Sequence, residues 1–279
     1  MTEELNKLIT NALQEDIREG DHTSLACIPK SAIGKAKLLV KENGVIAGVE
    51  VAKFIFLKVD PSIKVTVFIK DGDSIKVGDI ILEVEGPSIS ILTAERLVLN
   101  CMQRMSAIAT KTRKIKTLIK GTKAQVLDTR KTTPNFRHLE KLAVKIGGGT
   151  NHRFGLYDMM MIKDNHIDFA GGISAAIQKA NLYQEEKEIN IPIEIEARSI
   201  EEVVEILSQG NIHRIMLDNF SIEDTIKAVE LIGNKYQTES SGGITEETIA
   251  EYAKCGVDFI SVGALTHSIQ SLDLSLKAI

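Results

Sequence analysis

The hydrophobic and polar positions follow two different rhythms along the 279-residue chain. In the first part, residues 35–48 and 63–86 alternate apolar and polar positions around glycine-containing turns, a pattern typical of strands and hairpins. Residues 49–59, between them, carry apolar positions at helical spacing. Residues 93–119 contain few helix breakers, which predicts one long helix with Thr93 as its N-cap.

After Gly121, short apolar runs alternate with helical segments, such as 199–210 and 245–256, the latter with Thr245 as its expected N-cap. Six β-then-α units imply a parallel sheet, and so many units favour a closed or nearly closed barrel. An open doubly wound sheet is the alternative. The predicted strands span 124–129, 159–164, 191–197, 214–219, 236–241 and 259–264.

Composition narrows the classes of partner. The formal net charge is −4, which argues against a general binder of nucleic acid or of anionic membranes. No apolar run approaches the roughly 18 residues of a membrane span, and aromatic residues make up only 4% of the chain. Cys27, Cys101 and Cys255 are odd in number and far apart, which suits a reducing compartment. We therefore expect a cytoplasmic protein without nucleic-acid or membrane partners.

Within this acidic chain, basic residues concentrate between positions 130 and 163, where the only acids are Glu140 and Asp158. The basic residues there are Arg130, Lys131, Arg137, Lys141, Lys145, Arg153 and Lys163. A local cluster in an acidic protein indicates a small anionic ligand.

Each predicted strand of the second part ends in charged or small polar residues. In order these are Asp128, Arg130 and Lys131; Lys163, Asp164 and Asn165; Glu194 and Glu196; Asp218 and Asn219; Glu239, Ser240 and Ser241; and Gly263. One such residue alone would read as a helix cap or a solvated loop, but six ends in succession favour an active-site rim, because parallel α/β folds bind ligands there.

Period two places Glu194 and Glu196 on the same side of their strand. Carboxylates facing a barrel interior need cations or a metal beside them. Four basic residues are available as partners: Arg130, Lys131, Arg153 and Lys163. Cations of this kind suit carboxylate or phosphate groups, and the acids suit hydroxyl groups or Mg²⁺.

Two glycine-containing turns follow strands, SSGG at 240–243 and VGA at 262–264. Backbone amides at such turns, when they open a helix, form a cradle for phosphate, and barrels often place one after their last strands. The GGG at 147–149 lacks the last glycine of a dinucleotide fingerprint, and the chain contains no P-loop motif.

With TRKTTPNFR, GGGTNHRFGLYDMMMIKDNHI, IEIEA, IMLDNF, ESSGGIT and GVDFISVGALTHS in order, the chain resembles the quinolinate phosphoribosyltransferase family over essentially its whole length. Asn135 stands where that family commonly has Gly, and Asn tolerates left-handed backbone geometry. The resemblance implies an N-terminal open α/β sandwich followed by an irregular, incomplete α/β (TIM-like) barrel. We predict the division at 1–112 and 113–265, with a tail at 266–279 that can pack back on the first domain.

The resemblance also implies a reaction. Quinolinate and phosphoribosyl pyrophosphate (PRPP) would give nicotinate mononucleotide, pyrophosphate and CO₂ with Mg²⁺, in de novo NAD biosynthesis. Family members are homodimers or assemblies of dimers, so a homodimer is expected here.

Roles carry over to individual positions by motif. The residues expected around quinolinate are Thr129, Arg130, Lys131, His152, Arg153 and Lys163, with Arg96 reaching in from the partner subunit. Glu196 and Asp218 would hold ribose hydroxyls or Mg²⁺, which is otherwise bound mainly through PRPP. The 5-phosphate would lie on Ser241, Gly242, Gly243, Val262, Gly263 and Ala264. Lys131, Glu196 and Asp218 are the expected catalytic residues.

Two alternatives stay open. A molybdenum-transport-associated paralogue shares the fold and the RKT segment, but the intact NHRFGLYD and IKDNH stretches weigh against it. A small-anion sensor on the same fold would need no catalysis, although no expected site residue is missing from this chain.

Overall fold

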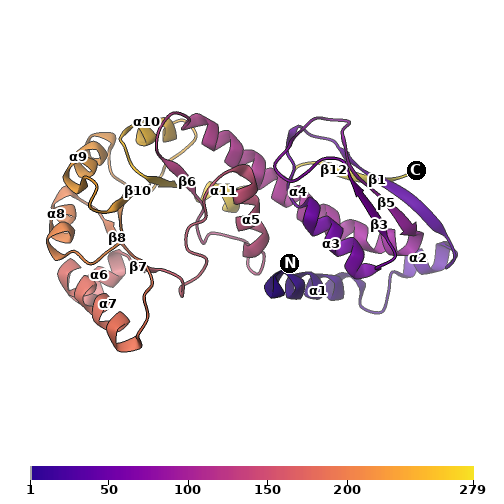
Figure 1. Cartoon of the computed structure of the whole chain (residues 1–279), viewed down its shortest axis with the longest axis horizontal. Coiled ribbons are helices and arrows are strands. Elements are labelled where there is room, and N and C mark those ends of the chain that lie inside the picture. Colours follow the sequence, from indigo (N-terminus) through magenta and orange to yellow (C-terminus); the bar gives the residue numbers. More distant parts are fainter. Residues whose placement is uncertain (1) are drawn as a thin grey trace. The chain divides into compact units, whose positions relative to one another are not determined.

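The computed structural model describes residues 2–279 and divides into two compact units. The first unit holds the chain up to Arg113 together with Thr132–Gly148 and Ala264–Ile279. The second holds Lys114–Lys131 and Gly149–Gly263. Each unit has its own sheet and its own covering helices (Figure 1).

The first unit is built on an antiparallel sheet with strand order β12-β1-β5-β3. Buried and accessible positions alternate along β1, with Ala36, Leu38 and Val40 inside, so one face forms the core and the other faces water. The strands are β1 (Ile33–Val40), β3 (Lys64–Val67), β5 (Ile80–Pro87) and β12 (Leu274–Ala278), while β2 (Gly44–Val45) and β4 (Ser74–Ile75) pair separately.

The helices of this unit include the predicted long one, but its start differs from the prediction. Helix α4 begins at Ser88, directly after Pro87 ends β5, and Thr93 lies inside it with its hydroxyl donating to the Ile89 carbonyl. Arg96 therefore lies well within the helix and not on its first turn. The helices are α1 (Glu3–Ile17), α2 (His22–Cys27), α3 (Val49–Val59), α4 (Ser88–Leu118), α5 (Arg137–Gly147) and α11 (Ala264–His267).

Helix α5 belongs to the first unit, although the predicted boundaries include its residues in the second domain. The reason is close packing on α4. Glu140 is fully buried and accepts from Nε and Nη2 of Arg104 at 3.0 and 2.8 Å. A Cβ on Gly147 would come within 2.6 Å of the Ala109 carbonyl oxygen, so glycine permits the approach. Asn135, just before α5, adopts the left-handed backbone (φ 63°) that was expected.

The second unit is built on a parallel sheet of six strands in the order β6-β11-β10-β9-β8-β7. From β7 to β11 spatial order follows chain order, and β6 and β7 are the two edges. A doubly wound sheet would reverse direction at a switch point, so the incomplete barrel is confirmed. The strands are β6 (Gln125–Leu127), β7 (Met160–Ile162), β8 (Ile193–Ala197), β9 (Arg214–Asp218), β10 (Gln237–Ser241) and β11 (Phe259–Ser261), each inside a predicted range.

Helices follow these strands and cover the outside of the sheet (Figure 1). Ser199 and Ser221 cap α8 and α9 by accepting from Glu202 N and Asp224 N. The last one, α10, starts at Ile249, so Thr245 is not its N-cap as predicted. The helices are α6 (Asp164–Ala170), α7 (Ile173–Lys187), α8 (Ile200–Gln209), α9 (Ile222–Ile232) and α10 (Ile249–Lys254).

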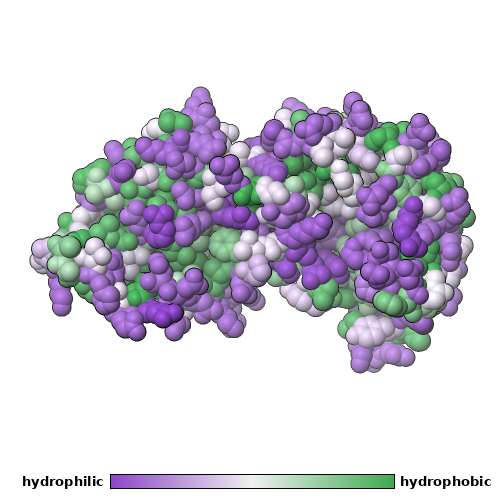
Figure 2. Space-filling view, turned by 180° about the vertical axis from the view of Figure 1, so that it is seen from behind, coloured by the Kyte–Doolittle hydropathy of each residue, from purple (hydrophilic) through white to green (hydrophobic). Residues whose placement is uncertain are grey.

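Among residues 2–279, every helix is too short or too polar to cross a membrane. On the face shown in Figure 2, small hydrophobic areas are interspersed among hydrophilic residues.

Candidate active site

Most of the predicted site residues lie in the second unit, where the parallel strands end. Arg96, in α4, and Ala264, the first residue of α11, belong to the first unit. The strand-end residues are Thr129, Arg130 and Lys131 after β6; Lys163 after β7; Glu196 in β8; Asp218 in β9; Ser241, Gly242 and Gly243 at and after β10; and Val262 and Gly263 after β11. His152 and Arg153 come from the loop that leads into β7.

Lys163 and Glu196 form an ion pair across the ends of neighbouring strands. The Glu196 carboxylate also accepts from the main-chain N–H of Asp164 at 3.3 Å. Glu196 is mostly buried, whereas about two fifths of the Lys163 side chain is exposed. The pairing that a carboxylate needs inside a barrel is thus supplied by a cation at the rim.

The ends of β9 and β10 are joined through Asn219, which has a left-handed backbone (φ 56°). Its side-chain amide donates to Asp218 at 2.8 Å, and its main-chain N–H donates to the Ser241 carbonyl at 2.9 Å. A Cβ on Gly242 would come within 2.9 Å of the Asn219 nitrogen, and Gly242 has φ 90°. Gly242 is therefore required by two independent constraints.

The glycine turn after β10 differs from the predicted phosphate cradle in one respect. It does not open a helix directly, because α10 begins only at Ile249. Gly242 and Gly243 both have positive φ values, 90° and 60°, so the turn itself sets the direction of the amides there.

The loop before β7 is fixed at two points by buried or half-buried carboxylates. Asp128, fully buried after β6, accepts from His152 N at 2.8 Å and from the Asn151 side chain at 2.5 Å. Asp158 accepts from the main-chain N–H groups of Phe154 and Gly155 at 2.6 and 2.9 Å. Arg153 lies between these two anchors, which restricts the directions that its guanidinium can take.

The cations of the rim repel one another. Burial and the charge of nearby Arg130 hold the pKa of the Arg153 guanidinium below its ordinary value. Nη1 of Arg153 donates to the Met159 carbonyl at 3.2 Å, and Arg130 and Lys131 are exposed. Two arginines in one partly dry site indicate an anionic ligand, because an anion would offset this repulsion.

Beneath the rim, the barrel interior holds a charged cluster, which we call the lower cluster: His152, Glu194, Arg214 and Glu239. Nη1 of Arg214 lies 2.9 Å from Glu239 Oε2 and 3.9 Å from Glu194 Oε1. Nε2 of His152 lies 2.9 Å from Glu194 and 3.3 Å from Glu239, as in an ion pair, without the alignment of a good hydrogen bond. Both glutamates are fully buried.

Sequence reasoning missed most of this cluster. It placed His152 among the quinolinate contacts, whereas the structure buries its ring against Glu194 and Glu239. Arg214 opens β9, where a basic residue reads as solvent-exposed, yet it is buried. The one available signal was that Glu194 and Glu196 share a strand face and need at least two cations.

The lower cluster retains a proton. Burial lowers the pKa of His152, but the contacts with Glu194 and Glu239 outweigh it and raise the pKa to about 9. Burial and the charge of Glu239 raise the pKa of Glu194 to about 7. The Arg153 N–H, 2.6 Å from His152 Nδ1, favours a neutral ring. These influences are reconciled if His152 and Glu194 share one proton, which leaves the cluster neutral whichever of them carries it.

His152, Glu194 and Glu239 have the composition of a metal site, with one ligand atom from each within 4.8 Å of the others. The surroundings do not suit a metal ion. Arg214 already contacts Glu239, and a His152 ring that accepts at Nδ1 carries its hydrogen on Nε2, which removes that lone pair. We interpret the cluster as an ion network.

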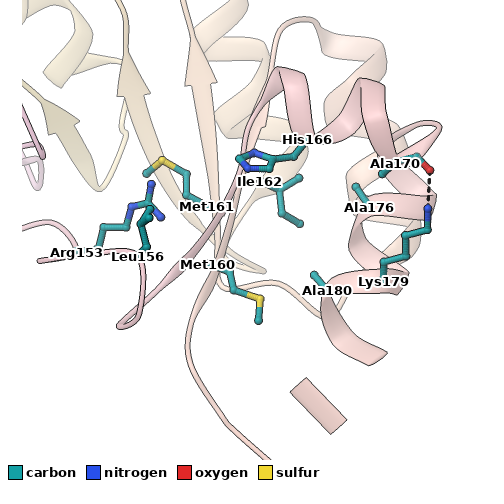
Figure 3. A pocket seen from close by; sticks show the side chains of 10 residues that line it. All are labelled: Arg153, Leu156, Met160, Met161, Ile162, His166, Ala170, Ala176, Lys179 and Ala180. Atoms are coloured by element: carbon teal, nitrogen blue, oxygen red, sulfur yellow. Dashed lines mark hydrogen bonds between the residues drawn. The ribbon is translucent and has the colours of Figure 1, made fainter. Parts of the chain in front are cut away.

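A hollow of about 340 Å³ follows the free edge of β7 in the second unit (Figure 3). The Arg153 guanidinium and Met161 lie on one side of the strand, and Met160, Lys179 and Ala180 lie on the other. Its lining is mainly apolar, with Arg153 and Lys179 as its charged members.

The fold and the site together define an α/β-barrel protein that binds small anions at the carboxyl ends of its strands. Family models for the N-terminal domain of quinolinate phosphoribosyl transferase match residues 21–106, and those for its C-terminal domain match residues 108–277. The chain belongs to the quinolinate phosphoribosyl transferase family.

Individual relatives match nearly the whole of this chain. The chain is 44% identical to quinolinate phosphoribosyltransferase [decarboxylating] 2b, mitochondrial, of Nicotiana tabacum, covering 99% of this chain and 82% of that protein. It is 41% identical to the probable nicotinate-nucleotide pyrophosphorylase [carboxylating] of Bacillus subtilis, covering 98% and 93%. The crystal structure of NadC from Streptococcus pyogenes superposes with a TM-score of 0.92 at 38% identity, covering 99% and 97%.

The shared proton leads to a prediction about stability. The folded-state pKa of His152 is about 9, against about 6.5 in an unfolded chain. Because the folded-state pKa is the higher one, this stabilisation is complete below about pH 6.5 and is lost as the pH rises through about 9. The gap sets an upper limit on the order of 3 kcal/mol.

The measurement is the free energy of unfolding in urea at pH 7, 8 and 9. His152→Gln, which does not titrate, is the matched variant and should show a flatter decline. Parallel declines in the two proteins would contradict a raised pKa at this site.

Proposed function

We infer that the chain is a quinolinate phosphoribosyltransferase, the carboxylating nicotinate-nucleotide pyrophosphorylase of de novo NAD biosynthesis. It transfers the phosphoribosyl group of PRPP to the ring nitrogen of quinolinate and releases pyrophosphate and CO₂. The observation that carries this inference is the set of cations at the strand ends, Arg130, Lys131, Arg153 and Lys163, in a chain that belongs to this family.

Quinolinate carries two adjacent carboxylates, and the rim offers groups that match them. A guanidinium donates two parallel hydrogen bonds to one carboxylate, which fixes its orientation as well as its position. Arg130 and Arg153 are near enough to repel each other in the free protein. A bound dianion would remove that repulsion, so binding gains from both effects.

The acids of the rim suit the other substrate. Glu196 and Asp218 stand on neighbouring strands and can accept hydrogen bonds from ribose hydroxyls. Oxygen ligands also suit Mg²⁺, but two carboxylates, one already paired with Lys163, do not make a complete cage. Glu196 and Asp218 would therefore supplement Mg²⁺ held mainly by the diphosphate, where it would neutralise the leaving group.

The turns after β10 and β11 suit the 5-phosphate. Ser241 offers a hydroxyl group, and the main chain of Gly242 and Gly243 can approach closely because neither has a Cβ. The second turn, Val262–Gly263–Ala264, follows the neighbouring strand β11. Two adjacent turns at the last strands of a barrel are a common phosphate site.

The chemistry asks more of positioning than of proton transfer. As pyrophosphate leaves, positive charge develops at C1 of the ribose, and the carboxylates of Glu196 and Asp218 would stabilise it. The ring nitrogen then forms the new bond to C1. Its positive charge accepts the electrons of the breaking C–CO₂ bond, and the ring carbon that loses CO₂ takes up a proton.

Membership of the family does not determine the cellular compartment. Several plant relatives have mitochondrial or chloroplastic names, including those of Nicotiana tabacum and Arabidopsis thaliana. A cytoplasmic location for this chain, inferred from its dispersed cysteines, remains a prediction.

The proposed reaction has a direct test. Purified protein with PRPP and Mg²⁺ should release pyrophosphate only when quinolinate is added, with an equal amount of CO₂. Nicotinate, which lacks one carboxylate, is the control substrate and should react far more slowly. Quinolinate binding without any pyrophosphate would identify an anion sensor, and no binding at all would sink the assignment.

Single cations of the rim should control quinolinate affinity. Lys131→Ala and Arg153→Ala should each weaken quinolinate binding about ten- to a hundredfold, because each removes a charged hydrogen-bond donor. Arg153→Lys should also bind poorly, since a point charge replaces a bidentate fork. Isothermal titration calorimetry measures the effect, with Lys227→Ala, at an exposed position of α9, as the control. Unchanged affinity in both alanine variants would falsify these roles.

The active protein is proposed to be a homodimer in which Arg96 completes the partner's site. Arg96 is exposed on α4 and borders a hollow of about 520 Å³ in the first unit, together with Lys41, Gln103 and Lys277. A surface salt bridge, the simpler role for such an arginine, would contribute only about 0–1 kcal/mol. Glu95 and Asp273 also line this hollow, but no salt bridge of Arg96 is found among residues 2–279.

Mixed dimers distinguish the two roles of Arg96. Arg96→Ala and Lys131→Ala chains are combined under conditions that allow subunit exchange, at a quinolinate concentration low enough that each alone has little activity. If Arg96 acts in the partner's site, one of the two sites in each mixed dimer contains both intact residues, and activity returns. If it acts in its own chain, every site still lacks one residue. Exchange is confirmed separately with differently tagged chains. If exchange occurs and no activity returns, the shared site is ruled out.

A further inference from the structure

A stable barrel interior does not require the lower cluster. Barrel interiors are normally filled by layers of branched apolar side chains. Replacing buried ion pairs by apolar residues of similar volume is often neutral or stabilising. Here Glu194, Arg214 and Glu239 occupy positions on three neighbouring strands that apolar side chains could fill. A role beyond packing is therefore indicated.

Arg214 is anchored at the base of the cluster. Its guanidinium stacks on the Phe259 ring, 4.1 Å from the ring centre, and its Nε and Nη2 donate to Gln237 Oε1 at 3.4 and 3.2 Å. The remaining nitrogen, Nη1, holds Glu239. A guanidinium held on three sides keeps the two glutamates in fixed positions, and both of them contact His152 Nε2.

His152 connects the lower cluster to Arg153 at the rim. Its main-chain N–H is held by Asp128, and its Nδ1 accepts from the N–H of Arg153 at 2.6 Å. The ring therefore contacts the lower cluster on one side and the peptide group of Arg153 on the other. Rotation of the ring would turn that peptide and move the Arg153 guanidinium.

We propose that Glu194, Glu239 and Arg214 are positioning residues, which fix the His152 ring and through it aim Arg153 at a quinolinate carboxylate. This inference rests on the function proposed above. The three residues need not touch either substrate, and their effect should be confined to quinolinate.

Charge alone and positioning predict different results when Glu194 is removed. The lower cluster is neutral as a whole. Removing Glu194 either leaves the cluster neutral, because the shared proton is lost with it, or leaves one net positive charge beneath an anion site. A purely electrostatic role then predicts unchanged or tighter quinolinate binding. A positioning role predicts weaker binding from the same substitution.

The decisive pair of variants is Glu194→Met and Glu194→Gln. Both remove the carboxyl group, but only the glutamine keeps a polar acceptor for His152. We expect Glu194→Met to weaken the quinolinate Kd about tenfold, as a misdirected contact does, and Glu194→Gln to stay within about threefold of the unmodified protein. The PRPP Kd should change by less than about twofold in both. Tighter or unchanged quinolinate binding in Glu194→Met would overturn the inference.

A double-mutant cycle tests the route through Arg153. In an Arg153→Ala background nothing remains to be aimed, so Glu194→Met should change the quinolinate Kd by less than about twofold. A full tenfold effect in that background would exclude the route. If Glu194→Met does not fold, as judged by circular dichroism, His152→Phe takes its place with the same expectations, and His152→Gln becomes the conservative partner.

The same titrations separate this inference from the proposed function. If the unmodified protein does not bind quinolinate, the function itself is wrong. If it binds and turns over quinolinate while Glu194→Met behaves like it, the function stands and only the positioning role fails.

Discussion

A charge inside a parallel barrel costs several kcal/mol unless an opposite charge lies beside it, and the second unit places charges at two levels between its strands. At the lower level the charges cancel within the cluster of His152, Glu194, Arg214 and Glu239. At the rim Lys163 balances Glu196, but the other cations exceed the acids. The excess positive charge is therefore confined to the level where a ligand can reach it.

This division has a consequence for catalysis. Donors that are already oriented when the substrate arrives stabilise developing charge without reorganising, which is the largest contribution in many enzymes. A rim built only on flexible lysines would lose that advantage, because each side chain would have to be ordered on binding. The loop from Asn151 to Asp158 avoids the loss for Arg153, since carboxylates hold the main chain on both sides of it.

In the second unit, the positions of the strands could be predicted from the sequence, but the contacts between charged residues in the barrel interior could not. All six strands lie within their predicted ranges because buried parallel strands are short, apolar and separated by helices of recognisable period. The polar strand ends were readable for the same reason. The lower cluster was not, because contact between His152 and Glu194 depends on the register of β8 to β10 and on the path of a loop. Local periodicity predicts neither the register of the strands nor the path of the loop.

The start of α4 and the placement of α5 show a second limit. SISILT at 88–93 has alternating β-branched residues that suggest a strand, yet tertiary packing makes it helical. Likewise α5 follows β6 in the chain but packs on α4 through Glu140 and Gly147. Its position next to β6 in the sequence does not predict this packing. Chain order predicts which strands are adjacent in a barrel, because each connection is short. It fails where a helix leaves that pattern, and here the departure separates β6 from β7 and leaves the barrel open.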